Sequence, residues 1–349
     1  MNGSRRLPVH WLRHVVTLLL LGLAVHLILP QITTLQHSLQ VIRDMAWGVI
    51  ALAAAAQVLS YVGSGLLIRA IAAITGDRLS PIRGALITAA SNSIGLVAGG
   101  VVASGAAVRR WARGSGVGKE GALLALWLPP LVSTAVLLLI TALGLVYLLA
   151  WHKVTTAEAV SFGLILLFLG LVIAAFAWGS RRRDRFSGMA TRLAGRVAAL
   201  LHRPYDPANT EASVARVFSG WDRLGHGGWR GPTLGAALTT LFDMLTLYLV
   251  FVAAGHPVRP EALLAGYGLP MLLARAPLMP PGGLGVVESS MVALFANLGV
   301  PKEVAVVVVL AYRLTSFWLP ILVGFALVPV MEHAAGGAER EPAQEGAVT

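Results

Sequence analysis

Eight apolar stretches, most of them long enough to cross a membrane, constrain this chain more than any other feature of its sequence. They cover residues 15–32, 45–68, 82–108, 122–150, 157–179, 232–254, 262–298 and 304–331. A helix needs about 20 apolar residues to span the hydrocarbon core of a bilayer. Within that core the backbone must satisfy its own hydrogen bonds, which favours helices. The sequence therefore predicts an all-α fold, a polytopic membrane helix bundle.

The composition agrees with a membrane protein and disfavours several other classes. Hydrophobic residues make up 56% of the 349 residues and charged residues only 12%, whereas about a quarter of the residues in soluble domains are charged. The net charge of +11 is explained by basic cytoplasmic loops, so no nucleic-acid partner is expected. The chain has no cysteine, and its nine histidines are scattered. No metal site and no cofactor are predicted.

The stretch 262–298 is too long for a single span and is interrupted near its centre. The interruption consists of Pro280, Pro281, Gly282, Gly283 and Gly285. These residues end a helix, because proline lacks an N–H and glycine costs backbone entropy. A break at membrane depth is tolerated only where protein or a water-filled cavity surrounds it. The stretch is therefore predicted to be a re-entrant helical hairpin, the place where transporters commonly hold their site.

The stretch 82–108 is similar in pattern and is predicted to be a second hairpin. When the chain is aligned with itself so that Gly99 and Gly100 fall on Gly282 and Gly283, Gly116 falls on Gly299 and Lys119 falls on Lys302. Basic residues flank 82–108 on both sides, which favours a hairpin that enters from the cytoplasm over a single span. The hairpin at 262–298 would enter from the outside. The sequence thus predicts an inverted repeat of 45–150 and 228–331, with six spanning helices in all.

Lysine and arginine residues predict the orientation. The loop 180–230 carries ten arginines and is expected in the cytoplasm. In the resulting topology both termini are cytoplasmic, and 20 of the 27 basic residues lie in cytoplasmic segments. Residues 189–201 of this loop suggest either a basic amphipathic helix on the anionic inner leaflet or a simple positive-inside linker. The predicted location is a bacterial-type cytoplasmic (inner) membrane.

Three further segments complete the predicted organisation. Residues 1–44 contain an N-terminal tail, a retained signal-anchor helix and an outer loop, because no small-residue cleavage site follows the first apolar stretch. Residues 151–227 contain the fifth span and the basic loop. Residues 332–349 are rich in alanine, glycine and glutamate and are expected to be a disordered cytoplasmic tail.

Four charged residues lie deep within apolar stretches and are candidate substrate-binding residues. They are Asp243, Arg275, Glu288 and Arg313. A charge at the centre of a membrane helix costs roughly 2.5–3.5 kcal/mol, so each needs a partner or water. Two interpretations satisfy this need. The charges could form internal ion pairs that hold the hairpin in the bundle, or they could form a site for a charged headgroup or a coupling ion. In the same self-alignment Arg275 falls on Asn92, which joins the candidates. Tyr312 is interpreted as a packing residue.

The sequence PGGLGVVE from Pro281 to Glu288, together with Tyr312-Arg313 and Pro320, resembles the lysylphosphatidylglycerol synthase transmembrane (flippase-like, UPF0104) family. The resemblance extends over roughly residues 10–332. It implies an integral inner-membrane protein whose site includes Gly282, Gly283, Gly285, Glu288 and Arg313. In the best-understood members this region moves aminoacylated phosphatidylglycerol across the bilayer. Other members are tied to hopanoid, glycolipid or polyprenyl-linked pathways.

These observations predict a membrane lipid translocator for a phospholipid or a lipid-linked glycan. Arg275 and Arg313 would meet the phosphate. Only 18 residues follow the last apolar stretch, too few for the aminoacyl-transferase domain of the bifunctional synthases, so no enzymatic activity is expected. Two alternatives stay open. One is an accessory subunit that presents a lipid to a separate membrane biosynthetic enzyme, and the other is an ion-coupled small-solute transporter.

Overall fold

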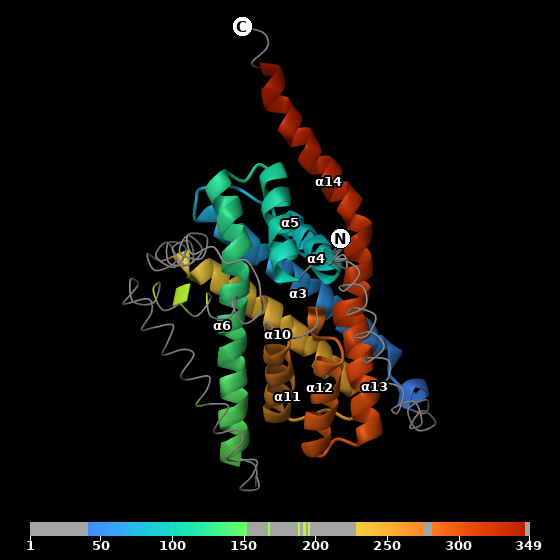
Figure 1. Ribbon diagram of the computed structural model, residues 1–349. Coiled ribbons are helices and arrows are strands. Elements are labelled where there is room, and N and C mark those ends of the chain that lie inside the picture. The colour runs from blue at the N-terminus through green and yellow to red at the C-terminus, as the bar shows by residue number, and fades with distance from the viewer. Residues whose placement is uncertain are drawn as a thin grey trace, which may run out of the picture. The chain divides into compact units, whose positions relative to one another are not determined.

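The computed structural model describes residues 41–98, 100–151, 228–275 and 281–345, together with five isolated residues between 167 and 195. Helices and turns make up this part of the chain, and it contains no β-strand (Figure 1). The all-α prediction is therefore confirmed. The predicted signal anchor at 15–32, the predicted span at 157–179 and nearly all of the basic loop 180–230 lie outside the described residues.

The helices follow the apolar stretches of the sequence closely. They are α3 (Trp47–Ala73), α4 (Pro81–Ala98), α5 (Val101–Gly114), α6 (Lys119–Trp151), α10 (Arg230–Ala253), α11 (Pro260–Leu273), the 3₁₀-helix η2 (Pro281–Gly283), α12 (Val286–Asn297), α13 (Lys302–Arg313), the π-helical η3 (Leu314–Trp318) and α14 (Leu319–Glu345).

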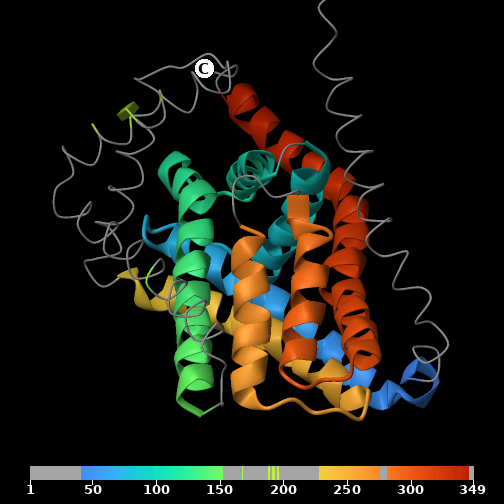
Figure 2. The same ribbon diagram turned by 60° about the horizontal axis from the view of Figure 1, so that its bottom comes forward.

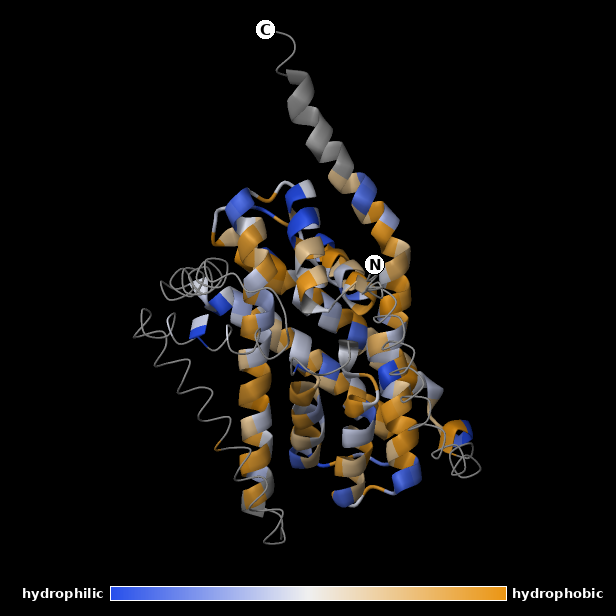
Figure 3. Ribbon diagram, viewed as in Figure 1, coloured by the Kyte–Doolittle hydropathy of each residue, from blue (hydrophilic) through white to orange (hydrophobic). Residues whose placement is uncertain are grey.

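Four helical segments of the described part are long and apolar enough to cross a membrane. They are Trp47–Ala73, Lys119–Tyr147, Arg230–Ala253 and Lys302–Ala335. They coincide with the predicted spans 45–68, 122–150, 232–254 and 304–331. Figure 3 shows apolar residues along α6 and α13, with hydrophilic residues gathered near the helix ends. The protein is therefore a helical membrane protein in its described part.

The chain divides into two compact units. Among the described residues, the first unit contains 41–57 and those of Asp243–Leu319, and the second contains those of Val58–Phe242 and those from Pro320 onward. Helices α3 and α10 each contribute one part to either unit. The charged candidates Asp243, Arg275, Glu288 and Arg313 all belong to the first unit.

In the first unit α11, α12 and α13 run side by side, as Figures 1 and 2 show. Phe295 of α12 is fully buried, and its ring meets that of Phe251 edge to face at 4.7 Å between centroids. Gly266 of α11 leaves room for this ring, because a Cβ there would lie 2.5 Å from Phe295 Cε1. Burying an aromatic side chain of this kind stabilises the unit by roughly 1.5–3 kcal/mol. The same packing fixes the positions of α11 and α12 on either side of the break.

In the second unit α4 and α5 form a helical hairpin. The chain turns at Gly100, whose φ of 73° and ψ of −143° are accessible mainly to glycine. The two helices approach closely at Gly95, where a Cβ would lie 3.0 Å from the Cβ of Ser104. Ser93 Oγ of α4 donates a 2.8 Å hydrogen bond to the carbonyl of Ile321 in α14.

The C-terminal segment differs from its sequence prediction. The composition of residues 332–349 predicts disorder, whereas α14 continues as a helix to Glu345. Alanine, glutamate and arginine are good helix formers, and Glu332 contacts α5 through Arg110 Nη2 at 2.7 Å and Trp111 Nε1 at 3.3 Å. Gly114 of α5 is also close to α14, since a Cβ there would lie 2.6 Å from Ala335 Cα. These contacts with α5 stabilise α14 beyond its apolar part.

The same backbone pattern occurs twice in the chain with one constant spacing. Helices α3 and α10 begin at residues 47 and 230, and α6 and α13 begin at residues 119 and 302. The turns that precede α6 and α13 also match. Gly116 and Gly299 have φ angles of 86° and 90°. Val117 N donates to Ala112 O at 3.1 Å, and Val300 N donates to Phe295 O at 3.0 Å, which is the pattern of a glycine-terminated helix end.

Candidate functional site

The break between α11 and α12 is built from glycines in a backbone conformation that other residues rarely adopt. Gly282, Gly283 and Gly285 have φ angles of 71°, 64° and 79°. A residue with a Cβ is strained at positive φ, whereas glycine is not. Gly282 lies within η2, and Gly285 immediately precedes α12. The backbone therefore leaves the helical path at these glycines. Pro280 lies outside the described residues.

The break is tightly packed against its surroundings. A Cβ on Gly282 would run into the ring of Phe317. A Cβ on Gly283 would lie 2.6 Å from the Cβ of Ala274 and 2.7 Å from Cγ2 of Val287, both closer than real Cβ contacts. These two glycines thus serve close packing as well as the turn itself. In its described residues, the break is closely packed at Gly282 and Gly283.

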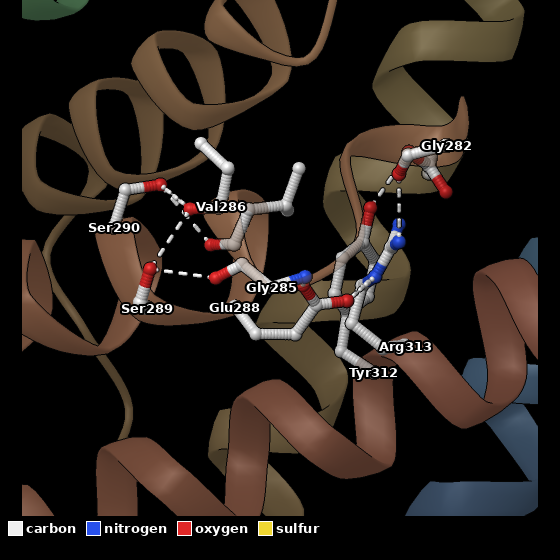
Figure 4. Close-up of polar contacts among 10 residues, drawn as sticks. Gly282, Gly285, Val286, Glu288, Ser289, Ser290, Tyr312 and Arg313 are labelled. Carbon is white, nitrogen blue, oxygen red and sulfur yellow. Dashed lines mark hydrogen bonds and ion pairs between the residues drawn. The ribbon is translucent and has the colours of Figure 1, made fainter. Parts of the chain in front are cut away.

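Glu288 joins the break to the first turn of α12. Its Oε2 accepts a 2.6 Å hydrogen bond from the backbone N–H of Gly285, and its Oε1 accepts one from Nε of Arg313, also at 2.6 Å. A carboxylate in the first turn of a helix also interacts favourably with the helix dipole. Figure 4 shows Glu288 between Gly285 and Arg313. Both carboxylate oxygens therefore have partners.

Arg313 connects the last helix of the first unit to both ends of this turn. Besides the bond to Glu288, its Nη2 donates a 2.9 Å hydrogen bond to the carbonyl of Gly282 (Figure 4). Its guanidinium carbon lies 4.1 Å from the centroid of the Phe317 ring, in the range of a cation–π interaction. The side chains of Arg313 and Glu288 are only 5% and 12% exposed. A buried charge needs this kind of complete pairing.

The helix changes its winding directly after Arg313. Residues Leu314–Trp318 form the π-helical segment η3. Single π-turns within α-helices insert an extra residue and often occur at functional sites. Here the π-turn carries Phe317, the residue that stacks on Arg313 and fills the space above Gly282. The change in winding and the glycine break therefore contact each other.

Asp243 has partners of a different kind. Its Oδ2 accepts hydrogen bonds from the hydroxyl groups of Tyr267 at 2.7 Å and of Tyr312 at 2.8 Å. The side chain of Gln57 also hydrogen-bonds this carboxyl group. The three partners come from α11, α13 and α3. Asp243 therefore lies in a cluster of neutral donors, next to but separate from the Glu288–Arg313 pair.

The other predicted site residues occupy different positions. Arg275 follows the end of α11 and is exposed. Asn92 is an exposed residue of α4, in the second unit. Gly100 is at the turn between α4 and α5, while Gly99 lies outside the described residues. The structure thus brings Glu288 and Arg313 into direct contact, and their role in binding a substrate stays a prediction.

Sequence reasoning missed the part that four residues play in this region. Tyr312, interpreted as a packing residue, also donates to Asp243. Tyr267, Gln57 and Phe317 were not singled out. A signal was present for Gln57 and Tyr267, since polar groups within apolar stretches need partners. Their pairing with Asp243 depends on how α3, α10 and α11 pack.

The fold and the site define a class, that of polytopic helical membrane proteins with a broken hairpin held by a buried ion pair. The chain matches the family described as "Lysylphosphatidylglycerol synthase TM region" over residues 11–324. It belongs to this family, and its membership confirms the resemblance drawn from the PGGLGVVE sequence.

Curated relatives carry the family's general name. A "UPF0104 membrane protein" of Methanothermobacter thermautotrophicus is 30% identical over 92 residues, which are 26% of this chain and 27% of the relative. A protein of the same name from Pyrococcus horikoshii is 36% identical over 86 residues, 25% of either chain. The matched part of the chain thus covers about a quarter of the length of these relatives.

Proposed function

We propose that this protein translocates a lipid across a bacterial-type cytoplasmic membrane, with a phospholipid or a lipid-linked glycan as substrate. The observation that carries the proposal is the buried Glu288–Arg313 pair, which holds a glycine break within an apolar helical region. Breaks of this kind within membrane helices are typical of transporter binding sites. The family name of the chain, which refers to a lipid synthase, supports a lipid as the substrate.

The proposed architecture has six spanning helices and two re-entrant hairpins, α4–α5 and α11–α12, arranged as an inverted repeat. It is supported by the helix starts and the glycine turns that recur with one constant spacing along the chain. Basic loops place both termini in the cytoplasm in this proposal. The loop 180–230 would then lie against the anionic inner leaflet.

Arg275 is the candidate for the first contact with the lipid phosphate. It is exposed and lies at the α11 side of the break. Arg313 is buried and bonded to Glu288 and Gly282. An arginine side chain can bind a phosphate through two parallel hydrogen bonds. Arg313 would keep the break in shape, and Arg275 would meet the headgroup.

The proposal is tested with purified protein in liposomes that contain trace fluorescent phosphatidylglycerol or phosphatidylcholine. Access of an impermeant quencher to the label reports movement between leaflets. Wild-type protein is expected to accelerate the movement of at least one of the two lipids, and Arg275→Gln to slow it. Arg259→Gln is the matched control, because Arg259 is an exposed arginine at the other end of α11.

Two results would contradict the proposal. One is that neither lipid moves between the leaflets faster in liposomes containing the wild-type protein than in protein-free liposomes. The other is an equal effect of both arginine substitutions, which would mean that Arg275 acts only through its charge. A lipid that co-purifies with an inactive protein would instead favour the accessory-subunit alternative.

A further inference from the structure

The cluster around Asp243 is a second polar site in the first unit, and the Glu288–Arg313 pair does not explain it. Asp243 lies near the middle of α10 (Arg230–Ala253), a helix long and apolar enough to span the membrane. At 1.5 Å per residue it is about 20 Å from the start of that helix and about 15 Å from its end. A carboxylate at this depth is costly and usually functional.

The hydrogen bonds of the cluster are unevenly distributed. Both tyrosine hydroxyls donate to the same oxygen, Oδ2 of Asp243, so neither tyrosine contacts Oδ1. Asp243 as a residue is half-buried. Oδ2 accepts both tyrosine hydrogen bonds, so Oδ1 is the oxygen that a proton would take.

Gln57 supplies the second, independent observation. It is only 6% exposed and hydrogen-bonds Asp243. Within the described part of the chain, its Oε1 atom has no hydrogen-bond partner. A buried polar atom without a partner costs about 1–3 kcal/mol. A half-turn of the amide would bring Oε1 to the carboxyl group, where it could accept a hydrogen bond from a protonated Asp243.

The charged and titratable groups around Asp243 are compatible with a proton on its carboxyl group. Tyr267 and Tyr312 are the titratable groups in direct contact. Arg313 is the cation that acts on Asp243, but its Nε is bonded to Glu288. Arg275 interacts with Tyr267. Asp243 thus has several neutral donors, and the cation that acts on it, Arg313, also pairs with Glu288.

A proton suits this cluster better than a metal cation. Hard cations need about six oxygen ligands, whereas the two tyrosine hydroxyls direct their hydrogens at Asp243 and not at a common centre. No group of three or more acidic, histidine or cysteine side chains that could hold a metal occurs in the described residues. One proton needs a single lone pair, and Oδ1, which accepts neither tyrosine hydrogen bond, can offer one.

We infer that Asp243, held by Tyr267, Tyr312 and Gln57, is a proton-binding site that couples lipid movement to the transmembrane proton gradient. The coupling rests on the proposed lipid translocation. In each cycle an O–H bond forms on Oδ1 with a proton taken from water on one side, and the proton returns to water on the other side. Rotation of the Gln57 amide lets it hydrogen-bond Asp243 in both protonation states, as a donor to the carboxylate and as an acceptor from the carboxylic acid.

The first experiment measures proton binding without transport. Infrared difference spectra of the purified full-length protein are recorded as the pH is changed, and the carbonyl band of a protonated carboxyl group is followed. The wild type should show such a band appearing as the pH falls. Asp243→Asn should lose it, and Glu261→Gln should keep it. Glu261 is a matched control, because it is a buried acid of α11 in the same unit that has no assigned role.

The second experiment measures coupling in liposomes. For one proton per lipid, a gradient of one pH unit can sustain up to about a tenfold ratio of labelled lipid between the leaflets, since one pH unit corresponds to a factor of ten in proton activity. Wild type and Glu261→Gln should approach this ratio. Asp243→Asn should leave the lipid evenly distributed, even where it still allows passive exchange.

The outcomes separate the inference from the proposed function. Lipid movement without a titrating Asp243 band, or movement that ignores the pH gradient, overturns the inference and leaves lipid translocation standing. A lipid ratio driven by a sodium gradient at constant pH also overturns it. An Asp243 band in a protein that moves no lipid overturns the coupling together with the proposed function, and limits Asp243 to proton binding alone.

Discussion

The Glu288–Arg313 pair allows a quantitative prediction about what holds the break together. Removing one partner of a buried ion pair costs about 3–5 kcal/mol, because the other charge is left without compensation. Glu288→Ala should cost about 3 kcal/mol, since Arg313 keeps the Gly282 carbonyl and the Phe317 ring. Arg313→Ala removes those contacts as well and should cost about 5 kcal/mol.

The double substitution removes both charges and leaves neither one buried alone. Its cost should be about 5–6 kcal/mol and not the sum of about 8, because directly contacting groups couple by up to about 3 kcal/mol. The measurement is the free energy of unfolding of the purified protein in mixed detergent micelles, for wild type, both single variants and the double variant. Both single variants should also lose lipid movement in liposomes.

A second cycle serves as the control. Glu303 and Arg313 lie ten residues apart on α13, about 15 Å along the helix axis. Arg313→Ala and Glu303→Ala should therefore be additive within about 0.5 kcal/mol. Strict additivity of Glu288→Ala and Arg313→Ala would contradict the prediction, since it would mean that the 2.6 Å contact between these residues contributes no interaction energy.

Three further predictions follow from other parts of the structure. Gly283→Ala should destabilise the protein in thermal unfolding by about 1–3 kcal/mol more than Gly299→Ala. Both glycines have positive φ, but only Gly283 is closely surrounded by other atoms. Equal effects of the two substitutions would exclude tight packing at the break. A membrane-impermeant maleimide should label Asn297→Cys in intact cells, since the turn after α12 is placed outside by the basic residues, and labelling from the cytoplasmic side alone would reverse the proposed orientation. Glu332→Gln should increase hydrogen exchange in α14 beyond residue 332 and leave the melting temperature nearly unchanged, because its contact to Arg110 is partly exposed; unchanged exchange would show that this contact does not anchor the helix.

The apolar stretches and the proline–glycine interruption of the sequence were enough to predict most of the helices of the described part and the position of the break. Four predicted spans coincide with long apolar helices of the described part, because the hydrocarbon core demands both apolar side chains and internal backbone hydrogen bonds. Gly282, Gly283 and Gly285 predicted the position of the break. The reason is again local, because their positive φ angles are rarely adopted by other residues. The tail at 332–349 was the exception. Its polar composition suggested disorder, but its contacts with α5 lie far away in the sequence.

Which polar groups are in contact could not be predicted from the sequence and depends on how the helices pack. Asp243, Glu288 and Arg313 all lie deep within apolar stretches of the sequence, and from the sequence Arg313 could have paired with either acid. Because α12 packs against α13, Arg313 forms an ion pair with Glu288. Asp243 instead accepts hydrogen bonds from Tyr267 and Tyr312. Helix periodicity sets the depth and the face of a side chain, but partners from different helices are chosen by how those helices pack, and no local pattern in the sequence encodes that choice.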